Sequence, residues 1–294
     1  MKVAVTGGTG FVGRNLVNRL VAEDHQVTVL THSDTGEGLF AGPVRTVAGS
    51  VDDALSLEAA FGGADVVYHL VGIIAETKHK TFERTVVVGT TNVVEACRRA
   101  GIEKLLYLSA MGTSHNARTE YHRTKYLAEQ AVIKSGMEYV IYRPSVIYGL
   151  DDGFVSLLVR LITKSPITPV IGNGHYRLQP VYIDDVVSAM VQALTVQQAN
   201  ERIIEIGGPE KLEYLEILHI IKRVLGKKRV NFHIPMWVMR AVASVMEKLM
   251  KPAPITRDQL KMMATGNTGD ITLMKQLFAI DPVPFEKGLR KYLR

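Results

Sequence analysis

The chain has 294 residues, of which 47% are apolar and 22% are charged, as is ordinary for a soluble globular protein of one large or two smaller domains. No apolar run approaches the roughly 20 residues that span a bilayer, and the N-terminus enters a strand at once instead of carrying a signal peptide. The single cysteine, Cys97, excludes an internal disulfide and a cysteine-rich metal site, and the nine histidines lack metal-ligand spacing. We therefore expect a cytoplasmic protein without a metal.

The first half of the chain alternates short apolar, β-branched runs with amphipathic segments of helix length. Near-continuous apolar strands separated by helices indicate a parallel sheet covered on both faces, and right-handed crossovers make it a doubly wound α/β fold. The predicted strands are Lys2–Thr6, Gln26–Leu30, Val44–Ala48, Asp65–Val71, Lys104–Ser109 and Tyr139–Arg143, and the predicted helices are Arg14–Val21, Ala54–Phe61, Phe82–Ala100 and Tyr121–Lys134.

The pattern changes after Gly149, where Gly, Pro and Asn interrupt the chain as far as residue 180. Val181–Asp185 and Arg202–Ile206 are predicted to return to the sheet as strands, and helices dominate from Leu212 onward. We expect a sheet domain of residues 1–150 and about 176–208. A smaller, mainly helical lobe of about 151–175 and 209–294 would then cover the strand ends and bind substrate.

The net charge of +6 lies in the second half of the chain. Residues 1–150 carry 15 basic and 15 acidic side chains, whereas residues 151–294 carry 20 and 14. The densest cluster, Lys227–Arg229, is either a solvated helix end or a contact for an anionic partner such as a diphosphate-bearing substrate or lipid headgroups. The basic residues are not interleaved with aromatic ones and no nucleic-acid motif is present, so we expect no nucleic-acid partner.

The stretch TGGTGFVG, Thr6–Gly13, follows the first strand directly and opens the first helix. Gly7 permits turn dihedrals that other residues avoid, Gly10 lets the backbone approach a phosphate, and Gly13 lets the helix lie near the strand. The free N–H groups and the positive end of the helix dipole would face that anion. A tight strand–helix turn is the plainer interpretation, but the position after a first strand favours a dinucleotide site.

Tyr121 and Lys125 are four residues apart and therefore share one helix face. A neighbouring ammonium favours the phenolate and would lower the tyrosine pKa from about 10, which would make Tyr121 a usable acid or base. Ser109 ends a predicted strand 12 residues earlier, where its hydroxyl could position a substrate oxygen against Tyr121. A surface Tyr–Lys pair is the alternative when this spacing occurs alone.

Together these residues resemble the short-chain dehydrogenase/reductase superfamily, in its extended branch of nucleotide-sugar epimerases and dehydratases. TGGTGFVG is similar to the cofactor loop of that branch, and Ser109, Tyr121 and Lys125 match its catalytic triad. Tyr142–Gly149 is similar to the strand and loop beside the nicotinamide, and Leu178–Val186 to the return strand.

Three further segments are nearer to one subgroup of that superfamily. It is the bacterial subgroup similar to the 39-kilodalton accessory subunit of respiratory complex I, and the segments are Asp152–Phe154, Gln179–Val181 and Ile255–Leu260.

The resemblance implies a Rossmann domain that binds NADP(H) or NAD(H). No acidic residue that could bind the NAD ribose occurs at the end of the second strand, and Arg14, His32 or Ser33 could contact a 2′-phosphate. This favours NADP(H). The implied cofactor-binding residues are Gly7, Thr9, Gly10, Phe11, Val12, Gly13, Thr31, His32, Ser33, Val71, Gly72, Tyr121, Lys125, Arg143, Pro144, Ser145 and Val146.

Some positions depart from the pattern of the superfamily. His69–Gly72 replaces an Asn- and Ala-rich motif, and Val86 stands where an Asn is usual. The 12-residue gap between Ser109 and Tyr121 is shorter than in typical sugar epimerases, whose intervening loop helps to form the sugar pocket. These differences argue against a sugar substrate more than against hydride chemistry.

The predicted helix Met236–Lys251 has a wide apolar arc opposite a polar face. It either packs on the sheet domain or provides a groove for an apolar substrate or a weak contact with a membrane surface.

Two functions remain open. The first is an NAD(P)-dependent oxidoreductase or epimerase/dehydratase-type enzyme, acting on a nucleotide sugar or on an apolar carbonyl compound or quinone. The second is a non-catalytic NAD(P)H-binding scaffold or redox sensor. A homodimer in which Phe82–Ala100 and Tyr121–Lys134 pair is a further expectation.

Overall fold

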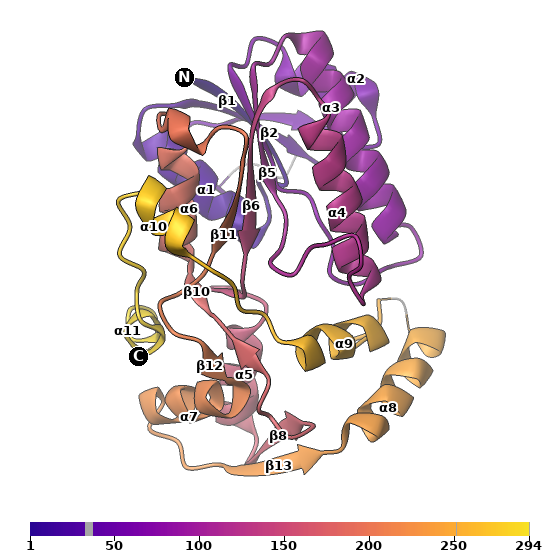
Figure 1. Cartoon of the computed structure of the whole chain (residues 1–294), viewed down its shortest axis with the longest axis vertical. Coiled ribbons are helices and arrows are strands. Elements are labelled where there is room, and N and C mark those ends of the chain that lie inside the picture. The colour runs from indigo at the N-terminus through magenta and orange to yellow at the C-terminus, as the bar shows by residue number, and fades with distance from the viewer. Residues whose placement is uncertain (33–37, 251, 294) are drawn as a thin grey trace.

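The computed structural model describes residues 1–32, 38–250 and 252–293, and its larger part is a parallel sheet flanked by helices (Figure 1). Every pairing within this seven-stranded sheet is parallel. In spatial order its strands are β11 (Arg202–Ile206), β6 (Glu138–Pro144), β5 (Lys104–Leu108), β4 (Val66–His69), β1 (Lys2–Thr6), β2 (Gln26–Thr31) and β3 (Arg45–Ala48). The doubly wound parallel fold that the sequence predicted is confirmed, and so is the return of Arg202–Ile206 to this sheet as β11.

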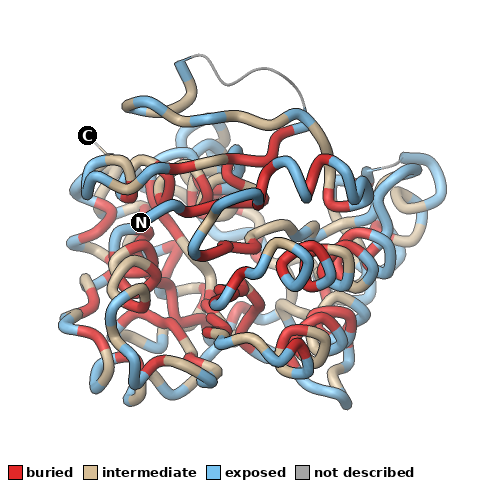
Figure 2. The backbone as a smooth tube through the Cα atoms, turned by 90° about the horizontal axis from the view of Figure 1, so that it is seen from above, coloured by how far each residue is buried: buried red, intermediate tan, exposed pale blue. Residues whose placement is uncertain are grey.

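The two faces of the sheet bury different side chains because successive residues of a strand point to opposite sides. In β1, Val3 and Val5 join the core beneath α1 (Phe11–Ala22) and α6 (Ile183–Gln192), whereas Ala4 joins the core on the other face. That second face is covered by α2 (Ala54–Phe61), α3 (Gly89–Ala100) and α4 (Glu120–Ile133). Figure 2 shows the buried residues along the central strands and the inner sides of the helices.

The remaining elements gather mainly at the carboxyl end of the sheet, at the bottom of Figure 1. They comprise three small sheets and several helices. The strand pairs are β7 (Ile147–Tyr148) with β10 (Val181–Tyr182), β9 (Arg177–Leu178) with β12 (Leu212–Glu213), and β8 (Ile167–Ile171) with β13 (Val230–Ile234). The helices are α5 (Val155–Lys164), α7 (Tyr214–Val224), α8 (Met236–Leu249), α9 (Arg257–Thr265), α10 (Thr272–Leu277) and α11 (Phe285–Leu289). A 3₁₀ turn, Gln197–Ala199, precedes β11.

Most predicted elements are confirmed within a few residues, but two differ. The predicted strand Val181–Asp185 is wrong beyond Tyr182, because α6 begins at Ile183 and β10 pairs with β7 instead of the large sheet. Asp185 lies in the first turn of that helix, and its carboxylate accepts a hydrogen bond from the Val283 N–H at 2.8 Å. The predicted helix Phe82–Ala100 starts as a π-helical turn, Glu83–Val88, and becomes α-helical at Gly89.

The glycine turn after β1 holds the first helix close to the sheet. A Cβ on Gly13 would lie 2.2 Å from the Gly7 carbonyl oxygen and 2.6 Å from the Gly8 Cα, so no larger residue fits between helix and turn. The carboxyl end of β1 therefore leads straight into α1, which begins at Phe11 and not at the predicted Arg14.

Candidate active site

Three segments converge where the sheet order reverses between β1 and β4. Gly7 has φ +76°, and a Cβ there would lie 3.0 Å from the Leu70 carbonyl carbon and the Val71 nitrogen. A Cβ on Gly72 would lie 3.2 Å from the Lys125 Nζ. The glycine turn, the segment after β4 and α4 are thus in direct contact, at the position where doubly wound sheets bind their ligands.

The N-terminus of α1 is suited to an anion. Among the described residues no side chain caps it, its first turn holds no acidic residue, and both Thr9 and Gly10 are exposed. A Cβ on Gly10 would face open space apart from the Gly7 carbonyl oxygen at 3.4 Å, so a phosphate can approach the backbone there. These features fit the pyrophosphate of a dinucleotide, with the Phe11 and Val12 N–H groups beside it.

Lys125 is buried, and its ammonium faces the carboxyl end of β5. Its Nζ donates a hydrogen bond to the Leu108 carbonyl oxygen at 2.7 Å and lies 4.9 Å from the centroid of the Tyr107 ring. Burial lowers the pKa of Lys125 to about 8, against an opposing effect of the Glu129 carboxylate. The ammonium is therefore charged at neutral pH and close to its titration point.

Glu129 extends the row of Tyr121 and Lys125 by one more helical turn, and the sequence reasoning missed it. Its carboxylate is fully buried and forms a two-pronged ion pair with Arg143, from Nε at 2.8 Å and from Nη2 at 2.5 Å. The Ser109 hydroxyl donates to the same carboxylate at 2.5 Å. The Ser109 hydroxyl therefore already donates its one hydrogen bond to Glu129. Toward a substrate, the Ser109 oxygen can act only as a hydrogen-bond acceptor.

Tyr121 is half-buried at the start of α4. Its ring packs edge-on against Phe82 and His122, with centroid distances of 6.0 Å and 5.1 Å. Burial raises the pKa of Tyr121 to about 12, so the predicted lowering by Lys125 is wrong for the protein alone. The phenol is protonated at neutral pH, which suits it to donate a proton.

Asp258 of α9 fixes the helix end that carries Tyr121. Its carboxylate accepts hydrogen bonds from the backbone N–H of Glu120 at 3.3 Å and of Tyr121 at 3.1 Å. Thr256 and Gln259 form a capping box at the start of α9 itself. Ile255–Leu260, a segment that carried the subgroup resemblance, thus connects the C-terminal elements to α4.

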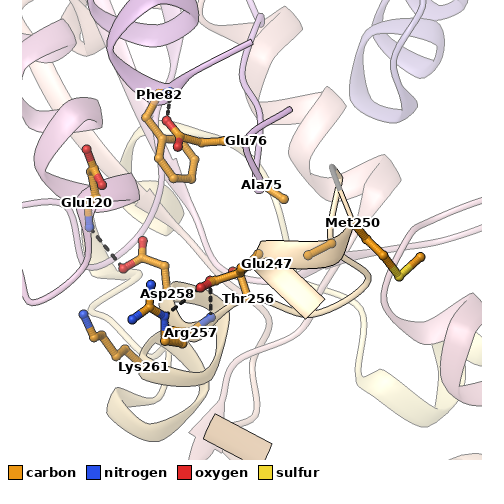
Figure 3. A pocket seen from close by; sticks show the side chains of 11 residues that line it. Ala75, Glu76, Phe82, Glu120, Glu247, Met250, Thr256, Arg257, Asp258 and Lys261 are labelled. Carbon is orange, nitrogen blue, oxygen red and sulfur yellow. Dashed lines mark hydrogen bonds and ion pairs between the residues drawn. The ribbon is translucent and has the colours of Figure 1, made fainter. Parts of the chain in front are cut away.

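Two cavities flank this helix end. The larger, about 400 Å³, lies between residues 75–82, the start of α4, and α8 with α9 (Figure 3). Phe82, Glu120, Glu247, Asp258 and Lys261 are among its lining residues, and in the figure Glu247 points to Arg257, which it binds at 2.6 Å.

The smaller cavity, about 230 Å³, lies on the His122 side of Tyr121. His122 and Asn267 are among its lining residues, and their buried Nε2 and Oδ1 atoms have no hydrogen-bond partner among the described residues. The His122 Nδ1 is 2.6 Å from the Thr119 hydroxyl. Burial lowers the pKa of His122, and the Met111 backbone and Asp258 oppose that shift.

The structure uses several of the predicted cofactor residues for its own contacts. Arg143 is bound to Glu129, the Pro144 carbonyl oxygen accepts from the Met111 N–H at 2.9 Å, and the Ser145 hydroxyl donates to the Asn267 carbonyl oxygen at 3.0 Å. The Val146 carbonyl oxygen accepts from the Val181 N–H.

The adenosine end of the predicted site is only partly described. Thr31 ends β2, and Ser33 lies outside the described residues. His32 is exposed, and its Nε2 is 3.4 Å from the Nζ of Lys80, a residue that the sequence analysis did not single out. Burial and Lys80 both lower the pKa of His32.

His69 is a buried histidine with a structural role. Its Nδ1 is 2.7 Å from the Thr6 hydroxyl and its Nε2 is 3.0 Å from that of Thr90, so the ring joins the end of β1 to α3. Burial lowers its pKa to about 3.

Within the described part of the chain, no group of side chains is suited to hold a metal ion. None of the helices described there has the length and apolar character that a membrane span requires.

The model of the NAD-dependent epimerase/dehydratase family matches residues 3–207, which hold the large sheet and the groups around Tyr121. The chain belongs to this family. Curated relatives include the 40 kDa subunit of mitochondrial NADH-ubiquinone oxidoreductase from Neurospora crassa, which is 26% identical over 87% of the chain and 69% of its own length. The 2-alkyl-3-oxoalkanoate reductase of Stenotrophomonas maltophilia is also 26% identical, over 99% of the chain and 98% of its own length.

Further comparisons include another curated relative and two solved structures with the same fold. A subunit of the same respiratory enzyme from Arabidopsis thaliana is 28% identical over 85% of the chain, which spans 64% of that subunit. The crystal structure of UDP-glucose 4-epimerase from Thermotoga maritima covers all of the chain, and is itself covered in full, at 21% identity with a TM-score of 0.77. The dTDP-glucose 4,6-dehydratase of Streptomyces venezuelae, solved with NAD, has a TM-score of 0.78 at 21% identity and covers 99% of the chain and 95% of its own.

Glu129→Gln should destabilise the protein by about 3 kcal/mol, because the substitution leaves the Arg143 guanidinium without its buried counter-ion. Glu58→Gln is the matched control, since the ion pair of Glu58 with Arg99 is exposed and worth at most about 1 kcal/mol. Urea unfolding of both variants checks the difference. Equal stability of the two would show that the buried pair does not hold α4 against the sheet.

Proposed function

We propose that this protein is a reductase of small carbonyl compounds that uses NADP(H) and takes Tyr121 as its proton donor. The observation that carries the proposal is the contact of Gly72 with Lys125 and of Ser109 with Glu129, on one face of α4 beside the glycine turn. A protein that only bound a nucleotide would need the turn but would not need Tyr121 and Lys125 beside it. The family is NAD-dependent, and the preference for NADP(H) is part of our proposal.

The residues would divide the chemistry as follows. When bound, the reduced cofactor supplies a hydride to the carbonyl carbon. The Tyr121 phenol, protonated because its pKa is about 12, donates its proton to the carbonyl oxygen. Lys125, one helical turn away, stabilises the phenolate that remains and holds the cofactor ribose. The Ser109 hydroxyl, which donates its own hydrogen bond to Glu129, accepts a hydrogen bond from the new hydroxyl group.

We infer that the substrate is a 3-oxo acid or a related carbonyl compound instead of a nucleotide sugar. The relative that matches the chain end to end is named as a 2-alkyl-3-oxoalkanoate reductase. The short connection between Ser109 and Tyr121 leaves little chain to surround a sugar. Lys261 lines the larger cavity and forms no ion pair within the part of the chain that the structure describes, so its ammonium can receive a carboxylate.

A non-catalytic, cofactor-binding subunit is the second candidate. The mitochondrial relatives are named as subunits of NADH-ubiquinone oxidoreductase, and the Ser109 hydroxyl is bound to a buried carboxylate instead of being free for a substrate carbonyl. This candidate requires cofactor binding without turnover.

Tyr121→Phe should lower the rate of NADPH-dependent reduction at least a hundredfold, because it removes the proton donor, and should leave NADPH affinity within a few-fold. The assay follows NADPH absorbance with a 3-oxoalkanoate, a quinone and UDP-glucose in turn. Tyr126→Phe, which removes a phenol on the same helix whose ring packs on the exposed His115, is the matched control. NADPH binding without turnover of any compound in this panel would favour the non-catalytic subunit.

Turnover should decline above about pH 8, because Lys125 loses the proton that stabilises the phenolate. The Tyr121 phenol stays protonated in this range, since its pKa is about 12. A profile of kcat/KM from about pH 6 to about pH 10 should therefore fall about tenfold per unit on its alkaline side. A flat profile across about pH 8 would contradict the role given to Lys125.

Lys80→Gln should weaken NADPH binding about tenfold while leaving NADH binding unchanged, because we assign the Lys80 ammonium and His32 to the 2′-phosphate. Lys78→Gln, two residues away on the same loop, is the control. Fluorescence titration with both cofactors measures the ratio of affinities. An equal loss for NADPH and NADH, or a wild-type preference for NADH, would contradict this assignment.

A further inference from the structure

Most of the apolar arc predicted for residues 236–251 is not covered by other parts of the protein. Within α8 only Ala243 is buried, and the helix packs mainly on α9, so the predicted packing on the sheet domain is wrong. Glu247 lies on the inner side, where it binds Arg257 of α9. The outer side exposes Trp237 (73%), Leu249 (79%) and Val245.

The β8–β13 pair lies with α8 at the lower end of the molecule (Figure 1), and it leaves apolar side chains exposed. In the β8–β13 pair, Val230 is the register partner of Ile167, and Phe232 is two residues further along the same face. Val230 is 71% exposed, and Phe232 and Ile167 are about half exposed. We call these three residues, with Trp237, Val242, Val245 and Leu249, the apolar end surface.

Positive charge accompanies this surface. Residues 227–249 contain Lys227, Lys228, Arg229, Arg240 and Lys248 but only one acidic residue, Glu247. That carboxylate is already bound to Arg257, so it offsets little of the charge. Lys227, Lys228, Arg240 and Lys248 are all exposed.

We propose that the apolar end surface docks on the surface of an anionic lipid bilayer, with α8 lying in the interface. Lys227, Lys228, Arg240 and Lys248 form no ion pair within the described residues. Exposed apolar side chains that include a tryptophan, next to such basic residues, are the combination that an anionic interface binds. A second copy of the chain is a poorer occupant. A twofold contact would bring the same lysines and arginines of both copies together.

Docking would also place the larger cavity near lipid. Glu247 and Met250, at the end of α8, line that cavity, so its wall would lie about one helix diameter, roughly 10 Å, from the bilayer surface. The proposal does not depend on the reductase activity, because it concerns a different face of α8.

Trp237 is the only tryptophan of the chain, so its fluorescence reports on this surface directly. The full-length protein is mixed with vesicles of phosphatidylcholine alone or of phosphatidylcholine with phosphatidylglycerol, at low and high salt. We expect a blue shift of Trp237 emission and co-sedimentation with the anionic vesicles at low salt only. Lys227→Gln combined with Lys228→Gln should weaken binding at least tenfold.

Leu249→Gln should lower vesicle binding several-fold because it removes exposed apolar surface that docking would bury, whereas Leu55→Gln should have no effect. The control is closely matched, since Leu55 is 77% exposed and lies on α2, outside the apolar end surface. No binding to anionic vesicles, or equal effects of the two leucine variants, would overturn the proposal. A dimer that Leu249→Gln dissociates, in a protein that ignores vesicles, would overturn it in favour of a second copy.

Discussion

The buried carboxylate of Glu129 is the interaction on which the site depends. It holds the Arg143 guanidinium of β6 and the Ser109 hydroxyl after β5, and it lies one turn from Lys125, which bonds to the Leu108 carbonyl oxygen. One face of α4 is thereby fixed against the carboxyl ends of two neighbouring strands. A buried charge without such partners would cost several kcal/mol, so the position of α4 is strongly determined.

At the start of α4, the C-terminal helix α9 determines where Tyr121 lies. Asp258 satisfies two backbone N–H groups at the start of α4, groups that a helix leaves without internal partners. The first turn of α4 is therefore held by α9, and the two turns that follow are held by the sheet through Lys125 and Glu129. The two cavities lie at this helix end, one lined by Glu120 and the other by His122, the two sequence neighbours of Tyr121.

The doubly wound fold could be predicted from the sequence because each strand is a short apolar run bounded by turn residues, and α2 was predicted at its observed bounds. The prediction was wrong at Val181–Asp185, where a two-residue strand passes directly into a helix and periodicity cannot separate the two. Lys125 was predicted from helical spacing, and continuing that spacing would have reached Glu129. Asp258 and the raised pKa of Tyr121 depend on tertiary contacts and burial, which spacing does not contain.

The most direct test of the account is a crystal structure of the protein with NADP⁺. The account predicts the pyrophosphate at the N-terminus of α1, Lys125 against the ribose, and the nicotinamide ring beside Gly72 with its C4 facing the Tyr121 hydroxyl. A ring bound away from Tyr121, or a hydroxyl turned from the cofactor while Ser109 stays on Glu129, would contradict it.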